Sequence, residues 1–233
     1  MIMIPARGGS EGIKDKNIKL FNGKPLIAYA IELAKSISEI NKVIVSTDSE
    51  EIAHVAREYG AEVPFVRPDL LSGPTISMDD VLEHSYQTLI SQGYVADCIV
   101  LLVPTNPLRN SNQIKKCIEL FYQAEADCVF TVNESPAHYT PYWTVIKDIN
   151  GDIKWFDGTK LVNGYTRRQD FPRKSYARND LVYAIKPSNF DKYQSLFGLK
   201  NEFIVTKAIY DIDINDSDDW EICEERHRFI YKD

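Results

Sequence analysis

The chain has 233 residues, a length that suits one large domain or one domain with an excursion from it. Its formal net charge of −7 argues against general affinity for nucleic acid through a basic surface. Hydrophobic residues make up 44% of the sequence, as in ordinary globular proteins, and no apolar run approaches the length of a membrane span. We therefore expect neither a nucleic-acid partner nor a membrane partner.

The cysteines indicate a reducing compartment. Cys98 and Cys128 lie inside apolar runs, where a buried free thiol is the simpler interpretation, and Cys117 and Cys223 give no metal-like spacing with them. The first residues form a short apolar run and a glycine loop, which is not the pattern of a signal peptide. These features predict a cytoplasmic protein.

The first seventeen residues carry the most informative pattern. An apolar run that ends at Pro5 leads directly into small and cationic residues: Arg7, Gly8, Gly9, Ser10, Gly12, Lys14, Lys16 and Asn17. Glycines let a backbone approach a ligand closely, and a buried strand that opens into such a loop forms an anion cradle. Neither the Walker order nor G-x-G-x-x-G is present. The pattern predicts a polyphosphate site of another kind, with an Arg and a Lys at the ends of the turn.

Strand and helix signals alternate over the first 135 residues. Apolar runs predict strands at 2–6, 42–47, 98–103 and 127–134, with a short extended piece at 61–66. Helical spacing, caps and terminal glycines predict helices at 25–37, 50–60, 77–93 and 111–125. Because the strands are nearly continuous Val, Ile and Leu, the alternation predicts an α/β fold with a parallel sheet covered on both faces.

Ligands of such sheets bind beyond the carboxyl ends of the strands. The first strand ends in the glycine loop, the second in Ser46-Thr47-Asp48 and the strand at 98–103 in residues 104–109, so we expect these ends to meet on one rim. Two residues there have two interpretations each. Asp48 either lies near a nucleotide or caps the helix that follows it. Arg109 either acts in function or only braces its loop.

Residues 136–178 interrupt the alternation. The stretch is rich in Pro, Tyr, Trp, Asn and Gly, and short alternating pieces at 142–148 and 152–156 suggest antiparallel hairpins. Aromatic residues and Arg are enriched in interface cores, so we interpret it as an excursion that forms a dimer arm; a capping subdomain within one monomer is the alternative. Strands at 180–187 and 204–214 and a helix at 217–230 follow. Residues 1–233 are thus expected to form one domain.

Six segments together resemble the acylneuraminate cytidylyltransferase family, the CMP-sialic acid synthetases. That family includes enzymes for legionaminic and pseudaminic acid and, more distantly, CMP-3-deoxy-octulosonate synthetases. The matching segments run in family order at 4–17, 21–31, 43–68, 101–109, 167–173 and 211–220.

The resemblance implies a doubly wound, Rossmann-like nucleotidyltransferase fold and a homodimer. The implied reaction joins CTP and a 2-keto-3-deoxy sugar acid, whose anomeric hydroxyl attacks the α-phosphorus to give a CMP-sugar and pyrophosphate. Nucleotidyl transfer leaves little covalent work for the protein, so catalysis rests on positioning and charge neutralisation.

The resemblance also implies residue roles. Arg7 and Lys16 would hold the triphosphate and act in catalysis, beside the backbone amides of Gly8, Gly9 and Ser10. Asn17 and Arg67 would contact the nucleotide, although Asn17 equally suits a turn. The implied acceptor-binding residues are Val103, Thr105, Arg168, Asn179 and Tyr183.

Residues 211–215 match the family's magnesium-binding segment. Residues two apart in a strand point to one side, so Asp211, Asp213 and Asn215 can present oxygens to one cation, and Mg²⁺ prefers hard oxygen ligands. The ligand pair is either Asp211 with Asp213 or Asp213 with Asn215. Asp213 belongs to both pairs and is also assigned a catalytic role. A solvated acidic strand end is the alternative.

Three departures from the family pattern concern the substrates. Glu11 stands where a Lys is usual, Val103 where sialic-acid enzymes commonly have Gln, and 177–180 reads Ala-Arg-Asn-Asp in place of Arg-x-Asn-Gly. Two alternatives stay open: a different acceptor, such as an eight-carbon keto-sugar acid, and a nucleotide-binding protein that has lost catalysis. Because an apolar side chain leaves a buried hydroxyl unmatched, we expect N-acetylneuraminate to be a poorer substrate than a deoxygenated, legionaminic-type acid.

Overall fold

The computed structural model describes residues 1–231. Six strands form one sheet, in the order β10-β6-β9-β5-β1-β4. They are β1 (Ile2–Pro5), β4 (Val43–Ser46), β5 (Ile99–Leu101), β6 (Cys128–Glu134), β9 (Tyr176–Ile185) and β10 (Asn201–Val205). β1 pairs in parallel with β4 and β5, and β10 pairs in parallel with β6. Only β9 runs antiparallel to its neighbours, β5 and β6.

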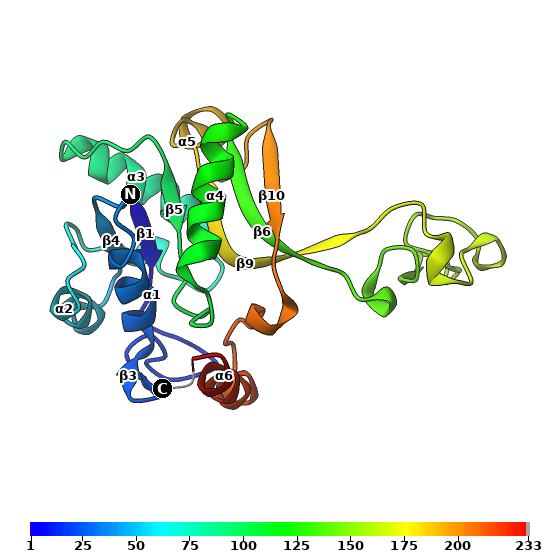
Figure 1. Cartoon of the computed structure of the whole chain (residues 1–233), viewed down its shortest axis with the longest axis horizontal. Helices are drawn as coiled ribbons and strands as arrows, with labels where there is room; N and C mark the ends of the chain where they lie inside the picture. Colours follow the sequence, from blue (N-terminus) through cyan, green and yellow to red (C-terminus); the bar gives the residue numbers. More distant parts are fainter. Residues whose placement is uncertain (232–233) are drawn as a thin grey trace.

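Helices cover both faces of this sheet (Figure 1). The covering helices are α1 (Leu26–Lys35), α2 (Glu50–Glu58), α3 (Met78–Ser91), α4 (Ser111–Gln123) and α5 (Ser188–Tyr193), whereas α6 (Ser217–Ile230) packs beyond the sheet. Successive side chains of a strand point to opposite faces, so Ile2 and Ile4 pack with α1, α2 and α4, whereas Met3 packs with α3 and α5. The predicted α/β fold, with a doubly wound and mostly parallel sheet, is confirmed.

A third apolar cluster lies beyond the sheet and positions the C-terminal segments. Helix α6 contributes Trp220 and Cys223, which pack with Ile13 and Leu108 and with two isoleucines of the extended segment 211–215, Ile212 and Ile214. The short hairpin of β2 (Leu20–Phe21) and β3 (Lys24–Pro25) also contributes to this cluster. Burial of each large apolar side chain favours folding by about 1.5–3 kcal/mol, so the cluster fastens the C-terminal helix to the loops at the sheet edge.

The predicted strand at 204–214 is wrong beyond Val205. After β10 the chain makes a single helical turn at Ala208–Tyr210 and then runs extended through 211–215 without a sheet partner. The expected alternation nevertheless holds, because Ile212 and Ile214 are buried while Asp211, Asp213 and Asn215 are exposed. Packing against α6, and not pairing in the sheet, therefore sets which side chains of this segment face solvent.

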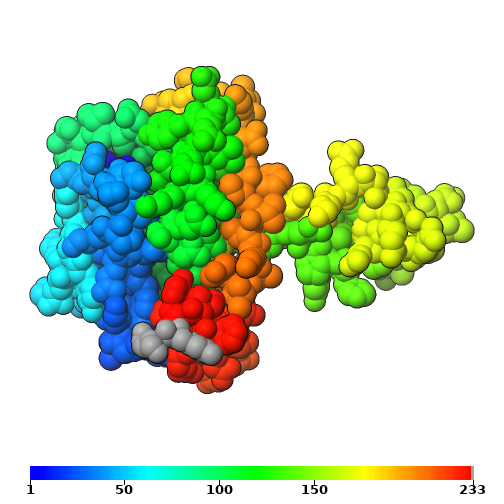
Figure 2. All heavy atoms as spheres, in the orientation of Figure 1, coloured from blue at the N-terminus to red at the C-terminus, as the bar shows by residue number. Residues whose placement is uncertain are grey.

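Between β6 and β9 the chain leaves the body as an arm, residues 136–175, which stands apart in Figures 1 and 2. Two short strands, β7 (Val145–Lys147) and β8 (Ile153–Trp155), form an antiparallel hairpin there. The arm covers most of the expected excursion, and residues from Tyr176 on belong to β9. None of the helices within residues 1–231 combines the length and apolar character of a membrane span.

Candidate active site

A cavity of about 450 Å³ opens where β1 and β5 end. Its lining includes most of the residues to which the sequence assigned a nucleotide or acceptor role, namely Arg7, Ser10, Lys16, Asn17, Arg67, Val103 and Thr105. These come from the glycine loop (residues 6–17), from the extended stretch after α2, and from the rim loop (residues 103–109). Of the candidate metal ligands, Asn215 lines it, whereas Asp211 and Asp213 are not among its lining residues. The predicted meeting of strand ends on one rim is confirmed, because the end of β4 also reaches the glycine loop through Asp48.

The glycine loop is held in place by two hydrogen bonds, one to Asp48 and one within the loop. Gly8 N–H donates to Asp48 Oδ1 at 2.9 Å, and Asn17 Nδ2 donates to the Arg7 carbonyl at 2.9 Å. Asn17 is therefore buried as a brace of the loop, in agreement with its interpretation as a turn residue, while it also lines the cavity. Asp48 does not cap α2, since Ser49 is the N-cap and accepts from the Ile52 N–H. The loop is preorganised before any ligand binds.

Arg67 is a buried cation in the cavity wall. It is 3% exposed, its Nη2 lies 3.6 Å from Asp48 Oδ1, and its Nε donates to Ser72 Oγ at 3.2 Å. Burial lowers the pKa of Arg67, the Asp48 carboxylate opposes this effect, and the charge of Arg7 adds to it. An anion beside Arg7 and Arg67 would offset their mutual repulsion. The same carboxylate, Asp48, thus orients both the glycine loop and this guanidinium.

Lys16 connects the glycine loop to residues 211–215, called the acidic segment from here on. Its Nζ donates to the Ile214 carbonyl at 2.6 Å, and burial lowers its pKa while Asp213 opposes the shift. Ile214 N–H in turn donates to the Thr105 carbonyl at 3.0 Å. Gly12 lies so close that a Cβ there would meet the Asn215 carbonyl oxygen at 2.0 Å. The glycine loop, the rim loop and the acidic segment are therefore packed against one another around the cavity.

The two aspartates of the acidic segment form a small anionic surface. Asn133 Nδ2 donates to Asp211 Oδ2, and Asn215 Nδ2 donates to Asp213 Oδ2 at 3.2 Å. Asp211 is exposed as a residue, but partial burial of its carboxyl group raises its pKa, and the hydrogen bond from Asn133 opposes this shift. Within residues 1–231 no group of three or more His, Cys, Asp or Glu is placed to hold a metal alone. Two carboxylates still fit Mg²⁺, which takes its other ligands from phosphates and water.

The rim loop is braced by Arg109. Its Nη2 donates to the Val103 carbonyl, and burial lowers its pKa to about 9, with the charge of Asp213 opposing. Tyr231 at the end of α6 donates to the carbonyls of Leu108 and Arg109, each at 2.9 Å. These contacts favour bracing over a direct role for Arg109. Half-buried Val103 presents an apolar side chain to the cavity.

Two predicted acceptor residues point into the interior and not into this cavity. Asn179 is 5% exposed and bonds to Asn133 and Thr206, whereas the Tyr183 ring packs in the core and its hydroxyl donates to Asp180. The reason is a bulge in β9, where the register with β6 shifts and Asp180 takes a φ of +53°. Neither residue lines this cavity, and their assignment to acceptor contact stays a prediction.

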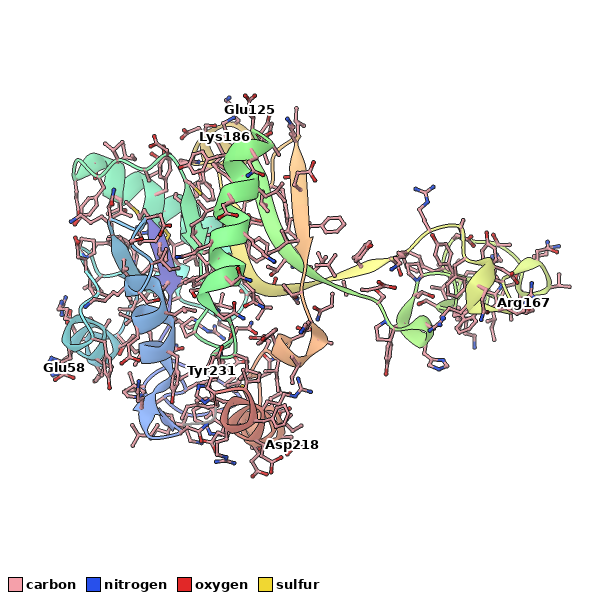
Figure 3. All side chains as sticks on the ribbon, viewed as in Figure 1. Glu58, Glu125, Arg167, Lys186, Asp218 and Tyr231 are labelled. Atoms are coloured by element: carbon pink, nitrogen blue, oxygen red, sulfur yellow. The ribbon has the colours of Figure 1, made fainter. Side chains whose placement is uncertain are left out.

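Arg168 is not at the cavity of its own chain. It lies on the arm, where it lines a second cavity of about 600 Å³ with Phe171, Arg173 and Lys174. Figure 3 labels the preceding residue, Arg167, far from the body. Residues 71–81, to which the sequence assigned no role, supply Leu71, Pro74, Ile76 and Met78 to the first cavity. That segment carries no motif, so only the folded chain brings it there. Exposed Glu11 lines the same cavity.

Comparison with known proteins identifies a family and several relatives with similar sequences. A family model described as Cytidylyltransferase matches residues 1–197. Post-translational flagellin modification protein B of Campylobacter coli is 34% identical over 225 residues, covering 95% of this chain and 92% of that protein. CMP-N,N'-diacetyllegionaminic acid synthase of Campylobacter jejuni is 33% identical with the same coverage. Pseudaminic acid cytidylyltransferase of Campylobacter jejuni is 41% identical over 134 residues, 58% of each chain.

Solved structures with low sequence identity share the fold. CMP:2-keto-3-deoxy-manno-octonic acid synthetase complexed with CTP superposes with a TM-score of 0.67 at 16% identity, covering 99% of this chain and 97% of that one. 4-Diphosphocytidyl-2C-methyl-D-erythritol synthase from Anaerococcus prevotii gives 0.64 at 13% identity, with 96% of each chain covered. The family match over most of the chain, together with the cationic cavity at the sheet edge, identifies the protein as a nucleotidyltransferase of the cytidylyltransferase family.

Proposed function

We propose that this enzyme transfers the cytidylyl group of CTP to the anomeric hydroxyl of a nine-carbon, sialic-like 2-keto-3-deoxy sugar acid. The hydroxyl oxygen forms a bond to the α-phosphorus, and the bond from that phosphorus to the bridging oxygen of the β-phosphate breaks. Pyrophosphate leaves, and the hydroxyl loses its proton. The products are a CMP-sugar and pyrophosphate.

One observation carries the nucleotide part of this proposal. Arg7, Lys16 and Arg67 converge on one cavity whose glycine loop is already fixed by Asp48 and Asn17. Preorganised cations that face the developing charge of a leaving group lower a barrier without reorganising during the reaction. Arg7 and Lys16 would bind the triphosphate, and backbone amides of Gly9 and Ser10 would assist. Buried Arg67 would hold the nucleotide beside them.

The acceptor part rests on the names of relatives and on the apolar wall of the cavity. Proteins of this family with similar sequences are named for legionaminic and pseudaminic acid. Val103 offers no hydrogen bond there, so an acceptor with methyl or acylamino groups in place of hydroxyls would fit it better. We assign Val103 and Thr105 to the acceptor side of the cavity for this reason.

We also propose Mg²⁺ as the cofactor, held by Asp211 and Asp213 of the acidic segment. When bound, the ion would neutralise phosphate charge and orient the triphosphate. The pair Asp211 and Asp213 is favoured over Asp213 and Asn215 because two carboxylates offer Mg²⁺ more negative charge than a carboxylate and a neutral amide, although Asn215 is the residue of the three that lines the cavity. Lys16, tied to Ile214 in the same segment, would keep the triphosphate close to these carboxylates.

We further propose a homodimer in which the arm packs on the partner and brings Arg168 to the partner's active site. The arm exposes apolar side chains, among them Val145, Ile149, Phe156 and Val162, the last being 86% exposed. Such a surface on a projecting element is typical of an interface. Mixing inactive Arg168→Ala and Asp213→Ala proteins should restore one intact site per mixed dimer. No recovery after confirmed subunit exchange would refute the exchange of Arg168.

A cytoplasmic location agrees with the cysteines, which are all free and buried. The experiment that tests the proposed reaction is a pyrophosphate-release screen. It combines ATP, CTP, GTP and UTP with a panel of eight- and nine-carbon keto-sugar acids, with and without Mg²⁺. We expect release only with CTP, Mg²⁺ and a nine-carbon acid. A clear preference for another nucleotide, or for an eight-carbon acid, would refute the corresponding part of the proposal.

A further inference from the structure

A buried polar network joins β6, β9 and the residue after β10, and ends at Asp211. Asn133 lies in β6 and is 6% exposed, and its Nδ2 donates to Asp211 Oδ2. Its Oδ1 accepts from Asn179 Nδ2 of β9 at 2.9 Å and from Thr206 Oγ1, just beyond β10, at 2.8 Å. Asn179 Nδ2 also donates to Thr206 Oγ1 at 2.7 Å. None of the three supporting residues lines the nucleotide cavity.

The network determines which way the Asn133 amide points. Both groups beside its Oδ1 are donors, so reversing the amide would place its NH₂ group against the NH₂ group of Asn179. Asn179 is itself oriented, because its Oδ1 accepts the Leu181 N–H at 3.5 Å. Thr206 is anchored by its own N–H, which donates to the Val132 carbonyl at 2.8 Å. The amide donor of Asn133 is therefore held toward Asp211.

The bulge in β9 makes this arrangement possible. Between the pairs Phe130–Tyr183 and Val132–Arg178 the register of β6 and β9 shifts, and Asp180 takes a left-handed conformation. Bulges redirect individual side chains of a strand. Here the bulge accompanies the inward orientation of Asn179, which reaches Asn133 of β6 and Thr206 beyond β10.

We propose that Asn133, held by Asn179 and Thr206, is a positioning residue that orients the Asp211 carboxylate for a divalent cation. The inference rests on the proposed function, in which Asp211 and Asp213 hold Mg²⁺. Asn133 occupies Oδ2 of Asp211, so the carboxylate cannot rotate freely and its other oxygen stays available. Mutation of a residue that hydrogen-bonds to a metal ligand typically lowers metal affinity about tenfold to a hundredfold.

The test measures Mn²⁺ binding to the protein without nucleotide, by electron paramagnetic resonance of the free ion. Asn133→Ala should weaken binding about tenfold, and the Mg²⁺ concentration that half-saturates turnover should rise in parallel. Asn189→Ala is the matched control, because Asn189 is equally buried but bonds only to the carbonyls of Asp127 and Leu196. It should lower stability without changing Mn²⁺ binding.

A second pair of variants tests the proposal even if Asn133→Ala does not fold. Thr206→Val removes only the hydroxyl of the network, which does not contact Asp211 itself, and should weaken Mn²⁺ binding measurably but less than the about tenfold effect of Asn133→Ala. Thr131→Val removes a buried hydroxyl of β6 that bonds only to the backbone of Val182, and should have no effect on binding.

The outcomes separate this inference from the proposed metal site. If Asp211→Ala weakens Mn²⁺ binding while Asn133→Ala and Thr206→Val bind like wild type, the positioning role is refuted and the metal site stands. If wild type and Asp211→Ala bind Mn²⁺ equally well, or neither binds it, both the metal site and the positioning role are refuted. Weakening in both network variants, with unchanged controls, supports the proposal.

Discussion

Substituting Gly12 by Ala tests whether the glycine loop and the acidic segment must stay in contact. The added Cβ would lie 2.0 Å from the Asn215 carbonyl oxygen and 3.1 Å from its carbon. Ordinary van der Waals contact begins at 3.4 Å, so one backbone segment has to move by about 1.4 Å. The obstacle is backbone and not a flexible side chain, so the strain cannot be relieved by a rotamer change. The contact between Lys16 and Ile214 would shift with it.

A displacement of about 1 Å at a positioning element costs on the order of a hundredfold in rate, and we expect Gly12→Ala to lower kcat/KM by about that factor. Overpacking should also reduce stability by about 1–3 kcal/mol. The assay is pyrophosphate release at saturating CTP and Mg²⁺, with thermal unfolding measured on the same samples. Gly8→Ala is the matched control, since its Cβ would meet Asp48 Oδ2 at 3.4 Å and fits without displacement.

Gly12→Ala activity within threefold of wild type, in a folded protein, would refute the reasoning. So would an equal loss in Gly8→Ala, because then any side chain in the loop would be harmful and the contact with Asn215 would explain nothing. Full loss of fold in Gly12→Ala would show that the contact supports folding, and the rate argument would fail.

Three further predictions follow from single residues or small groups. Asp213→Ala should lower turnover about a hundredfold with little change in stability, because its side chain is exposed, and wild-type activity at saturating Mg²⁺ would rule out its role. N-acetylneuraminate should have a lower kcat/KM than a legionaminic-type acid, and a tenfold advantage for N-acetylneuraminate would refute the interpretation of Val103. Burial raises the pKa of Cys98 to about 11 and that of Cys223 to about 12, so a thiol reagent at neutral pH should react with no cysteine before unfolding and with four afterwards; rapid reaction of the native protein would contradict this.

The parts of the fold that follow from local patterns could be predicted from the sequence. Continuous apolar runs predicted the strands around Ile4, Val45 and Val100, because a strand buried on both faces needs apolar residues at every position. The glycine loop was predicted to begin directly after β1, and it lines the cavity. The alternation of Asp211, Ile212 and Asp213 predicted the exposed carboxylates even though the expected strand does not form there.

The parts that depend on distant partners could not be predicted in this way. The run around Val182 predicts a strand, but nothing local places β9 antiparallel between β5 and β6. The bulge turns Asn179 inward because of pairing with β6, so its bonds to Asn133 and Thr206 carry no signal in the spacing. Asp48 suited a helix cap by its position, yet its carboxylate is used by Gly8 and Arg67, which lie in two other segments.

The central claim is that a sugar hydroxyl attacks the α-phosphorus of CTP in this enzyme. It is tested most directly by following oxygen atoms in a reaction run with CTP, Mg²⁺ and a legionaminic-type acid equilibrated in heavy-oxygen water, with mass spectrometry of all products. We expect a CMP-sugar that carries the heavy oxygen in the bridge between phosphorus and sugar, together with unlabelled pyrophosphate. Heavy oxygen in free CMP or in pyrophosphate, without a coupled sugar product, would contradict it.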